Sequence, residues 1–168
     1  GVGVDVDKPL IAAVSGYCVG GAFCLVQFCD FAVASESADF FYPEAQIGFC
    51  GGLIAGLAAR LPHKIAMEFM LLGEDFDAQR ALAAGMVNKV VPTGEEETQA
   101  HAWAKVLAES APLVVQGLKE LSLATLPKSP AEAGAIARNQ LLGIKYSADG
   151  AEGRKAFGEK RTPEFRGE

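Results

Sequence analysis

The chain has 168 residues, half of them hydrophobic and about a fifth charged, which is enough for one domain with a substantial core. Its formal net charge of -6 argues against nucleic acid as a partner. No apolar run approaches the roughly 20 residues of a membrane span, and the first residues lack the features of a signal peptide. Four cysteines without a CxxC pair, and only two histidines, disfavour a structural zinc site and favour a reducing, cytoplasmic location.

The first half of the chain alternates short apolar runs with glycine-containing turns. Apolar runs predict strands over Leu10–Val14, Asp30–Ala34 and Asp39–Phe41. Two glycine pairs, Gly20-Gly21 and Gly51-Gly52, each precede an apolar helix, and these helices are predicted over Gly21–Cys29 and Leu53–Leu61. The resulting pattern is typical of an α/β fold.

The second half of the chain is mainly helical. Helices are predicted over Lys64–Leu72, Ala78–Ala84, Glu95–Ser110, Leu113–Leu126, Pro130–Tyr146 and a short final segment to Glu159, with one more strand over Asn88–Val91. Asp77 and Gly85 are expected to cap the helix that they flank, and Asp149 to cap the final helix. The chain is therefore divided into residues 1–91, with strands and turns, and residues 92–168, a helical region.

The glycine pair Gly20-Gly21 lies between an apolar strand and an apolar helix. One interpretation is a tight turn with close packing. The other is a ligand site, because a free backbone N–H at a helix start can stabilise a developing oxyanion. Gly52 repeats this arrangement at a second helix start, where its N–H could bind a water or a substrate oxygen.

Glu44 is the carboxylate that most resembles a catalytic group, because its sequence neighbours include Phe40, Phe41, Tyr42, Ile47 and Phe49. Burial among such residues would raise its pKa and suit it to proton transfer near neutral pH. The alternative is an ordinary loop carboxylate in solvent. Cys24, three residues beyond Gly21, is either a small packing residue or a thiol activated near a helix start.

Several motifs in the expected order resemble the enoyl-CoA hydratase/isomerase (crotonase) family. They are Lys8-Pro-Leu-Ile-Ala-Ala-Val14 with Gly16-Tyr17, the Gly20-Gly21 frame with Cys29-Asp30, Ala38-Asp-Phe40, Pro43-Glu44, Ile47-Gly48, Leu72-Gly-Glu74, the segment Asp77 to Val91, and Phe157-Gly-Glu-Lys-Arg161. The resemblance spans Lys8 to Phe165 and implies a crotonase-like ββα spiral core followed by a helical oligomerisation region. It also implies that the family's usual domain continues upstream of Lys8, where a second oxyanion donor and much of the adenine pocket lie.

The resemblance assigns roles to individual residues. Gly21 corresponds to the oxyanion-hole glycine, Glu44 to the second catalytic carboxylate, and Gly52 to the glycine near the catalytic water. Cys24 occupies the position at which hydratases of the family carry their first catalytic Glu. Phe157 and Lys160 correspond to residues that approach coenzyme A, often on a neighbouring subunit.

The expected function is that of an acyl-CoA enzyme with one Glu proton shuttle, acting on an enoyl-CoA thioester. Coenzyme A would enter only as part of the substrate, without a further cofactor or metal, and the assembly would be a homotrimer or a hexamer. Two alternatives stay open at this point. One is a non-catalytic protein that binds coenzyme A or oligomerises, and the other is an acyl-CoA thioester hydrolase.

Overall fold

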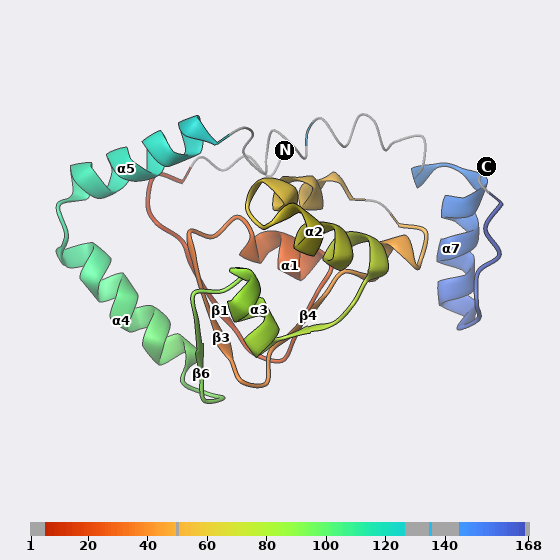
Figure 1. The fold of residues 1–168 in the computed structure, drawn as a ribbon, viewed down its shortest axis with the longest axis horizontal. Helices are drawn as coiled ribbons and strands as arrows, with labels where there is room; N and C mark the ends of the chain where they lie inside the picture. Colours follow the sequence, from red (N-terminus) through yellow and green to blue (C-terminus); the bar gives the residue numbers. More distant parts are fainter. Residues whose placement is uncertain (1–5, 50, 127–134, 136–144, 167–168) are drawn as a thin grey trace.

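In the computed structural model, two small sheets lie at the centre of the described residues, with some helices packed close to them and others at the two ends of the molecule (Figure 1). The structure describes residues 6–49, 51–126, 135 and 145–166. Both helices and parallel strands are present in the order that the sequence indicates, which confirms the α/β class.

The first sheet is parallel and has the strand order β1-β3-β6. Its strands are β1 (Ile11–Val14), β3 (Phe31–Ser35) and β6 (Lys89–Val91). A side-chain contact extends the pairing of β3 with β6. Asn88, the residue before β6, accepts a hydrogen bond of 2.8 Å from the Ala32 N–H through its Oδ1. The strands of this sheet match the predicted ones to within one residue at each end.

The second sheet has the order β2-β4-β5, in which β4 runs parallel to β2 and antiparallel to β5. Its strands are β2 (Tyr17–Val19), β4 (Asp39–Phe41) and β5 (Phe76–Asp77). The sequence did not predict β2 or β5, because runs of three and two residues are too short to display a recognisable period.

The helices fall into regular and irregular ones. The α-helices are α1 (Gly21–Val26), α2 (His63–Met67), α3 (Ala78–Ala84), α4 (Glu96–Glu109), α5 (Pro112–Thr125) and α7 (Ala148–Glu159). The irregular ones are the 3₁₀ segments η1 (Pro43–Ala45) and η2 (Gly52–Ala59) and the π-helical segment η3 (Glu68–Leu72). The helix predicted over Pro130–Tyr146 lies almost entirely outside the described residues.

Three details of the helices differ from the prediction. Helix α1 ends at Val26 rather than Cys29, because the Cys29 N–H donates to the Val26 carbonyl in a tighter turn. The segment predicted over Leu53–Leu61 is the 3₁₀ helix η2, and the end of the one over Lys64–Leu72 is π-helical.

Helix caps were predicted correctly for α3 and wrongly for α7. Asp77 accepts a hydrogen bond of 2.7 Å from the Arg80 N–H at the start of α3, and Gly85 ends that helix with a φ of 77°. At α7 the cap is Ser147, whose hydroxyl accepts from the Gly150 N–H at 3.0 Å. Asp149 lies inside the first turn, where a carboxylate still favours the helix dipole.

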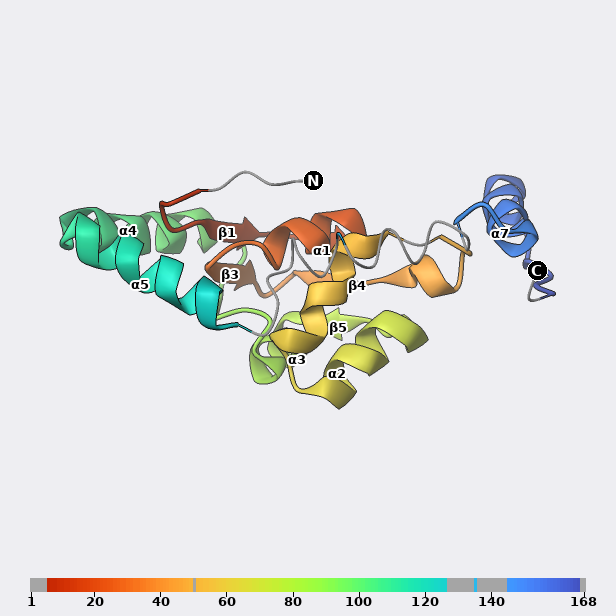
Figure 2. The ribbon, with the colours of Figure 1, turned by 90° about the horizontal axis from the view of Figure 1, so that it is seen from above.

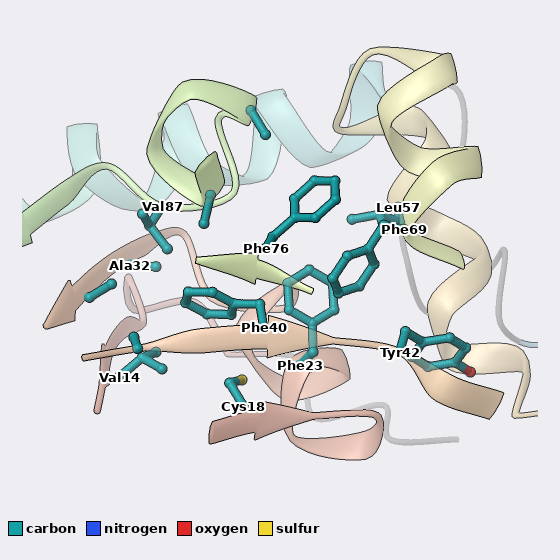
Figure 3. Packing of buried hydrophobic residues seen from close by; sticks show 14 of the residues in the cluster. Val14, Cys18, Phe23, Ala32, Phe40, Tyr42, Leu57, Phe69, Phe76 and Val87 are labelled. Carbon is teal, nitrogen blue, oxygen red and sulfur yellow. The ribbon is translucent and has the colours of Figure 1, made fainter. Parts of the chain in front are cut away.

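Aromatic side chains fill the space between the second sheet and the helices (Figure 3). Phe69 of η3 is central, with ring centroids 4.6 Å from Phe23 and 5.3 Å from Phe76. Phe40 of β4 packs edge-on against Phe23 at 6.2 Å. All four rings are at most 2% exposed, so this cluster fixes α1 and η3 against the sheet.

The two ends of the molecule are built differently (Figures 1 and 2). At one end, α4 packs on β1 and β3 with Trp103 against Phe31, and Lys119 of α5 bonds Asp30 at 2.8 Å. At the other end, α7 rests on the segment that follows η1, where Gly153 meets the backbone of Ile47 and Gly48. Because η1 carries Glu44, α7 lies beside the segment that leads out of the candidate site.

Candidate active site

The candidate site centres on Glu44, which the short helix η1 holds below the surface at 8% exposure. Pro43 starts η1, and the Phe49 N–H donates to the Glu44 carbonyl at 3.0 Å. The carboxylate oxygen Oε2 has no hydrogen-bond partner among the described residues. Burial raises the pKa of the Glu44 carboxyl above its ordinary value, and a hydrogen bond from its own backbone offsets this in part.

Gly20 forms the wall against which the Glu44 carboxylate rests. A Cβ atom on Gly20 would overlap Glu44 Oε1 and lie 3.3 Å from Cδ. Gly20 also has a φ of 53°, a region that glycine enters far more easily than other residues. This position therefore requires glycine for two independent reasons, its backbone angle and the close approach of the carboxylate.

Gly21 begins α1 directly beside that wall, and its backbone is exposed. The Gly20 N–H is used in a bond of 3.0 Å to the Phe41 carbonyl. The Gly21 N–H, in contrast, belongs to the first turn of α1, whose N–H groups have no acceptor within their own helix. Of the two glycines, Gly21 is thus the one with an N–H suited to a substrate oxygen.

Cys24 lies one turn into α1 and is 4% exposed. Burial raises the pKa of its thiol to about 11, and the nearby charge of Glu44 and the thiol of Cys18 act in the same direction. The side chain is therefore a neutral thiol near neutral pH, which is the opposite of an activated nucleophile. One small group of residues thus surrounds the start of α1. It consists of Gly20, Gly21, Cys24 and Glu44.

Gly52 lies at the first turn of η2, and two side chains hold this turn. The Tyr42 hydroxyl donates to the Gly51 carbonyl at 3.4 Å, and Gln27 Nε2 donates to the Leu53 carbonyl at 2.5 Å. Sequence reasoning missed Gln27. The available signal was a single amide in an otherwise apolar helical run, Phe23-Cys-Leu-Val-Gln27.

Phe157 and Lys160 lie on and just after α7, away from the Glu44 carboxylate. Together with Gln46, Ile47 and other residues of α7 and of the segment after it, they line a cavity of about 230 Å³. Phe157 is 68% exposed. The structure therefore places these two residues next to the segment that leaves Glu44, and not in the group around α1.

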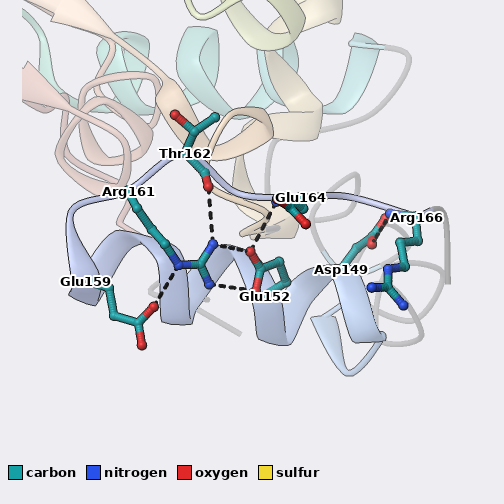
Figure 4. A network of polar contacts seen from close by, with 7 residues as sticks. All are labelled: Asp149, Glu152, Glu159, Arg161, Thr162, Glu164 and Arg166. Atoms are coloured by element: carbon teal, nitrogen blue, oxygen red, sulfur yellow. Dashed lines mark hydrogen bonds and ion pairs between the residues drawn. The ribbon is translucent and has the colours of Figure 1, made fainter.

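A network of polar contacts holds the chain after α7 against that helix (Figure 4). Arg161 donates to both carboxylate oxygens of Glu152, at 2.5 and 2.9 Å, and to Glu159 at 2.7 Å. The Glu164 N–H also donates to Glu152, at 3.1 Å. These contacts, with Arg161 foremost, lower the pKa of the Glu152 carboxyl to about 2.

Comparison with known proteins decides the family. The family model described as enoyl-CoA hydratase/isomerase matches residues 4–168.

The chain belongs to the enoyl-CoA hydratase/isomerase family.

Relatives with known names support the same assignment. The chain is 40% identical to the carnitinyl-CoA dehydratase of Proteus mirabilis and 39% identical to that of Salmonella typhi, over 97% of its own length and 65% of theirs. Among solved structures, carnitinyl-CoA hydratase from Mycobacterium avium aligns with a TM-score of 0.87 at 36% identity, covering 97% of this chain and 64% of that one. The chain thus spans about 65% of the length of these relatives.

Structural similarity also settles the architecture. An enoyl-CoA hydratase/isomerase from Pseudoalteromonas atlantica aligns with a TM-score of 0.88 at 27% identity, over 96% of this chain and 66% of that one. The predicted crotonase-like α/β fold is therefore confirmed.

The described residues also bear on two other features, a metal site and a membrane-spanning helix. In the part of the chain that the structure describes, no group of three or more His, Cys, Asp and Glu side chains is arranged to hold a metal ion. No described helix combines the length and the apolar composition needed to cross a bilayer.

Proposed function

We propose that the protein acts on an acyl-CoA thioester and moves a proton with Glu44 as its single catalytic carboxylate. The observation that carries this proposal is a buried carboxylate with a raised pKa, lying against the glycine before a helix start. Within the described part of the chain, one of its oxygens has no hydrogen-bond partner. A carboxyl group whose pKa approaches the working pH both accepts and releases protons effectively. Membership of the enoyl-CoA hydratase/isomerase family supplies the substrate class.

The proposed chemistry begins at the thioester carbonyl. The Gly21 N–H donates to the carbonyl oxygen, which makes the adjacent carbon more acidic and stabilises the enolate that forms. Glu44 then removes a proton from the acyl chain or delivers one to it. Family resemblance assigns a supporting place near the site to Gly52.

The neutral thiol at Cys24 shapes which reaction is favoured. Two carboxylates are needed when one holds the water and the other moves the proton, and here the position of the first one carries the Cys24 thiol, whose pKa is about 11. We therefore favour a double-bond shift, in which Glu44 takes a proton from one carbon and returns it to another. Water elimination is the second candidate, because the Proteus and Salmonella relatives are named carnitinyl-CoA dehydratases.

Coenzyme A enters the proposal as part of the substrate and not as a separate cofactor. Phe157 and Lys160, which border the cavity beside Ile47, are proposed to contact it. A homotrimer or hexamer is proposed from the apolar residues that α5 exposes, with Leu113 at 82% and Leu118 at 61%. The free thiols of Cys18, Cys24 and Cys29 support a reducing compartment such as the cytoplasm.

The deciding experiment uses the full-length protein with crotonyl-CoA, a 3-enoyl-CoA and the Glu44→Gln variant. Loss of proton transfer should lower kcat by about 10²- to 10⁴-fold, while Glu109→Gln, a change of an exposed carboxylate on α4, should leave the rate unchanged. For the wild type, kcat/KM for a base-limited reaction should fall as the pH drops through the raised pKa of Glu44.

The products separate the candidate reactions. A double-bond shift supports isomerisation, and gain or loss of water supports hydration chemistry. Free coenzyme A indicates the thioester hydrolase, and saturable binding without turnover indicates the non-catalytic alternative. A normal rate for Glu44→Gln on the preferred substrate would refute the proposed role of Glu44.

A further inference from the structure

The turn that ends η3 contacts both ends of η1, the short helix that carries Glu44. Leu72 is the last residue of η3, and Gly73 follows it with a φ of 64°. The Leu72 carbonyl accepts a hydrogen bond of 2.8 Å from Nε2 of Gln46, the residue directly after η1. The last carbonyls of a helix have no donor within that helix, so a side-chain amide is a suitable partner.

Gly73 allows this contact, because it leaves open the space that the Gln46 amide fills. A Cβ atom on Gly73 would lie 2.8 Å from Gln46 Nε2 and 3.2 Å from its Cδ. The same atom would lie 3.3 Å from the carbonyl oxygen of Tyr42, the residue directly before η1. The turn at Gly73 therefore lies against the residues on both sides of η1.

The segment η3 is fixed by contacts of its own. Its Phe69 is fully buried, with the ring centroid 5.3 Å from that of Phe76 and 6.5 Å from that of Tyr42 (Figure 3). Its first residue, Glu68, forms an ion pair with Arg80 of α3, and the Arg80 guanidinium lies over the Phe76 ring. Contacts with the aromatic core and with α3 therefore set the position of η3.

The Glu44 carboxylate itself rests against Gly20, on a different element. Gln46 comes two residues after Glu44, and its N–H donates to the Pro43 carbonyl at 2.9 Å within η1. A shift of Gln46 is therefore passed to Glu44 through one short turn of backbone. Since the carboxylate is buried where η1 meets Gly20, releasing η1 from η3 should admit water to it.

We propose that Gln46 is a positioning residue, which uses its hydrogen bond to Leu72 to hold η1 in place and so keeps the Glu44 carboxylate buried. The inference rests on the proposed function in one respect, because it takes Glu44 as the catalytic carboxylate. Gln46 also lines the cavity of about 230 Å³ beside α7. A decisive test therefore separates a positioning role from a contact with a ligand in that cavity.

A titration of the ligand-free, full-length protein tests the proposal without turnover. In protein with ¹³C-labelled glutamate, the carboxyl signals report the pKa of each group, and Glu44→Gln identifies the signal of Glu44. Gln46→Met keeps the length of the side chain but removes the donor. Water should then reach the carboxylate, and the pKa of Glu44 should fall toward its ordinary value because burial is what raises it.

The matched control is Gln99→Met. Gln99 lies on α4, at the end of the molecule away from α7, and its side chain pairs with Lys89 (Figure 1). This variant loses a comparable contact and should leave the pKa of Glu44 unchanged. The neighbouring thiols of Cys18 and Cys24 have pKa values of about 11 and stay neutral during the titration.

A second variant disturbs the same contact from its other partner. In Gly73→Ala the added methyl group would crowd the Gln46 amide, so the pKa of Glu44 should fall as it does in Gln46→Met. The two changes should not add in the double variant, because both remove one contact. Gly85→Ala has a positive φ but open space around its Cβ, so it controls for backbone strain and should leave that pKa unchanged.

Kinetics with crotonyl-CoA or the 3-enoyl-CoA, whichever is turned over, complete the test. A positioning role predicts that Gln46→Met lowers kcat by about tenfold with little change in KM, because the catalytic group is displaced. The acid limb of kcat/KM should also move to lower pH, together with the pKa of Glu44.

The outcomes distinguish this inference from the proposed function. An unchanged pKa of Glu44 in Gln46→Met, or a kinetic change confined to KM, would show that Gln46 only lines the cavity and would overturn the inference. A lowered pKa together with a normal rate for Glu44→Gln would refute the proposed catalysis and leave the positioning of Glu44 by Gln46 intact.

Discussion

Two glutamates, Glu44 and Glu152, show how differently the two ends of this molecule treat a carboxylate. Glu44 is buried, one of its oxygens has no hydrogen-bond partner among the residues that the structure describes, and its pKa is raised. Glu152 is held by both arms of Arg161 and by the Glu164 N–H, and its pKa is lowered to about 2. The first arrangement prepares a group to exchange protons, whereas the second keeps a charge in place to hold the chain after α7.

Each region also depends on a glycine that allows a close approach. Gly20 makes room for the Glu44 carboxylate, and Gly153 makes room for the backbone of Ile47 and Gly48. Substitutions of Gly20 and Gly153, and then of Glu44 and Glu152, separate the role of the candidate site from that of α7. The expected effects below run from the largest to the smallest.

Gly20→Ala should have the largest effect, because its methyl group would overlap Glu44 Oε1 at a backbone angle that disfavours alanine. Displacing the carboxylate by about 1 Å should lower kcat/KM by about 100-fold or more. Gly85→Ala is the matched control. It has a positive φ of 77° and open space around a Cβ atom, so it should lose about 1–2 kcal/mol of stability and keep its activity. Equal activity losses in both variants would contradict the contact with Glu44.

Gly153→Ala should release α7 without disturbing the core, because the added methyl group would overlap the Ile47 carbonyl. Overpacking costs about 1–3 kcal/mol, so hydrogen exchange of the Ala148–Glu159 amides should accelerate by about tenfold or more. Gly158→Ala lies on the same helix with no atom within 4 Å of its Cβ. That variant should slow exchange instead, because alanine favours the helix.

Glu44→Gln should remove a pH-dependent penalty on stability. Since burial raises the pKa of Glu44 in the folded state, the protein is most stable while this group is protonated and loses stability as the pH rises through that pKa. Urea unfolding should find the variant at least as stable as the wild type at pH 8, with the difference shrinking toward pH 4. A variant that is less stable at pH 8 would show that the carboxylate is paired after all.

Glu152→Gln should have the smallest effect and the opposite pH dependence. Its lowered pKa means that its contribution is present at neutral pH and is lost as the pH falls from about 4.5 toward about 2. Proteolysis after α7 should be faster in this variant at pH 7 and in low salt, and the difference should fade at high salt because Arg161 and Glu152 are partly exposed. Glu159→Gln, which removes a single contact with Arg161, should show a weaker change.

The sequence predicted what depends on local pattern. The strands around Ala32 and Phe40, the caps Asp77 and Gly85, and the family all follow from residue order. It missed β2 and β5, whose few residues form strands only because β4 lies between them. It also misplaced the cap of α7, because Asp149 and Ser147 are both good capping residues and the sequence does not say where the helix begins.

The site was only partly within reach of sequence reasoning. Glu44 was predicted as a catalytic group because aromatic residues surround it in the sequence, whereas its observed burial involves Gly20, which is 24 residues away. Gln27 was missed because its importance comes from a contact with Leu53, 26 residues further on. The division at residue 91 stays a prediction, as do the roles of Gly21, Glu44, Gly52, Phe157 and Lys160.

The buried thiols of Cys18 and Cys24 can report how often the packing around the site opens. Both thiols are buried, and burial raises the pKa of each to about 11. Alkylating reagents should therefore react with them only when the packing around α1 opens. In a protein whose Cys29 and Cys50 are replaced by serine, the rate of labelling would report how often that opening occurs. Slower labelling in the presence of an acyl-CoA would then measure, in free-energy terms, how much the ligand closes the site.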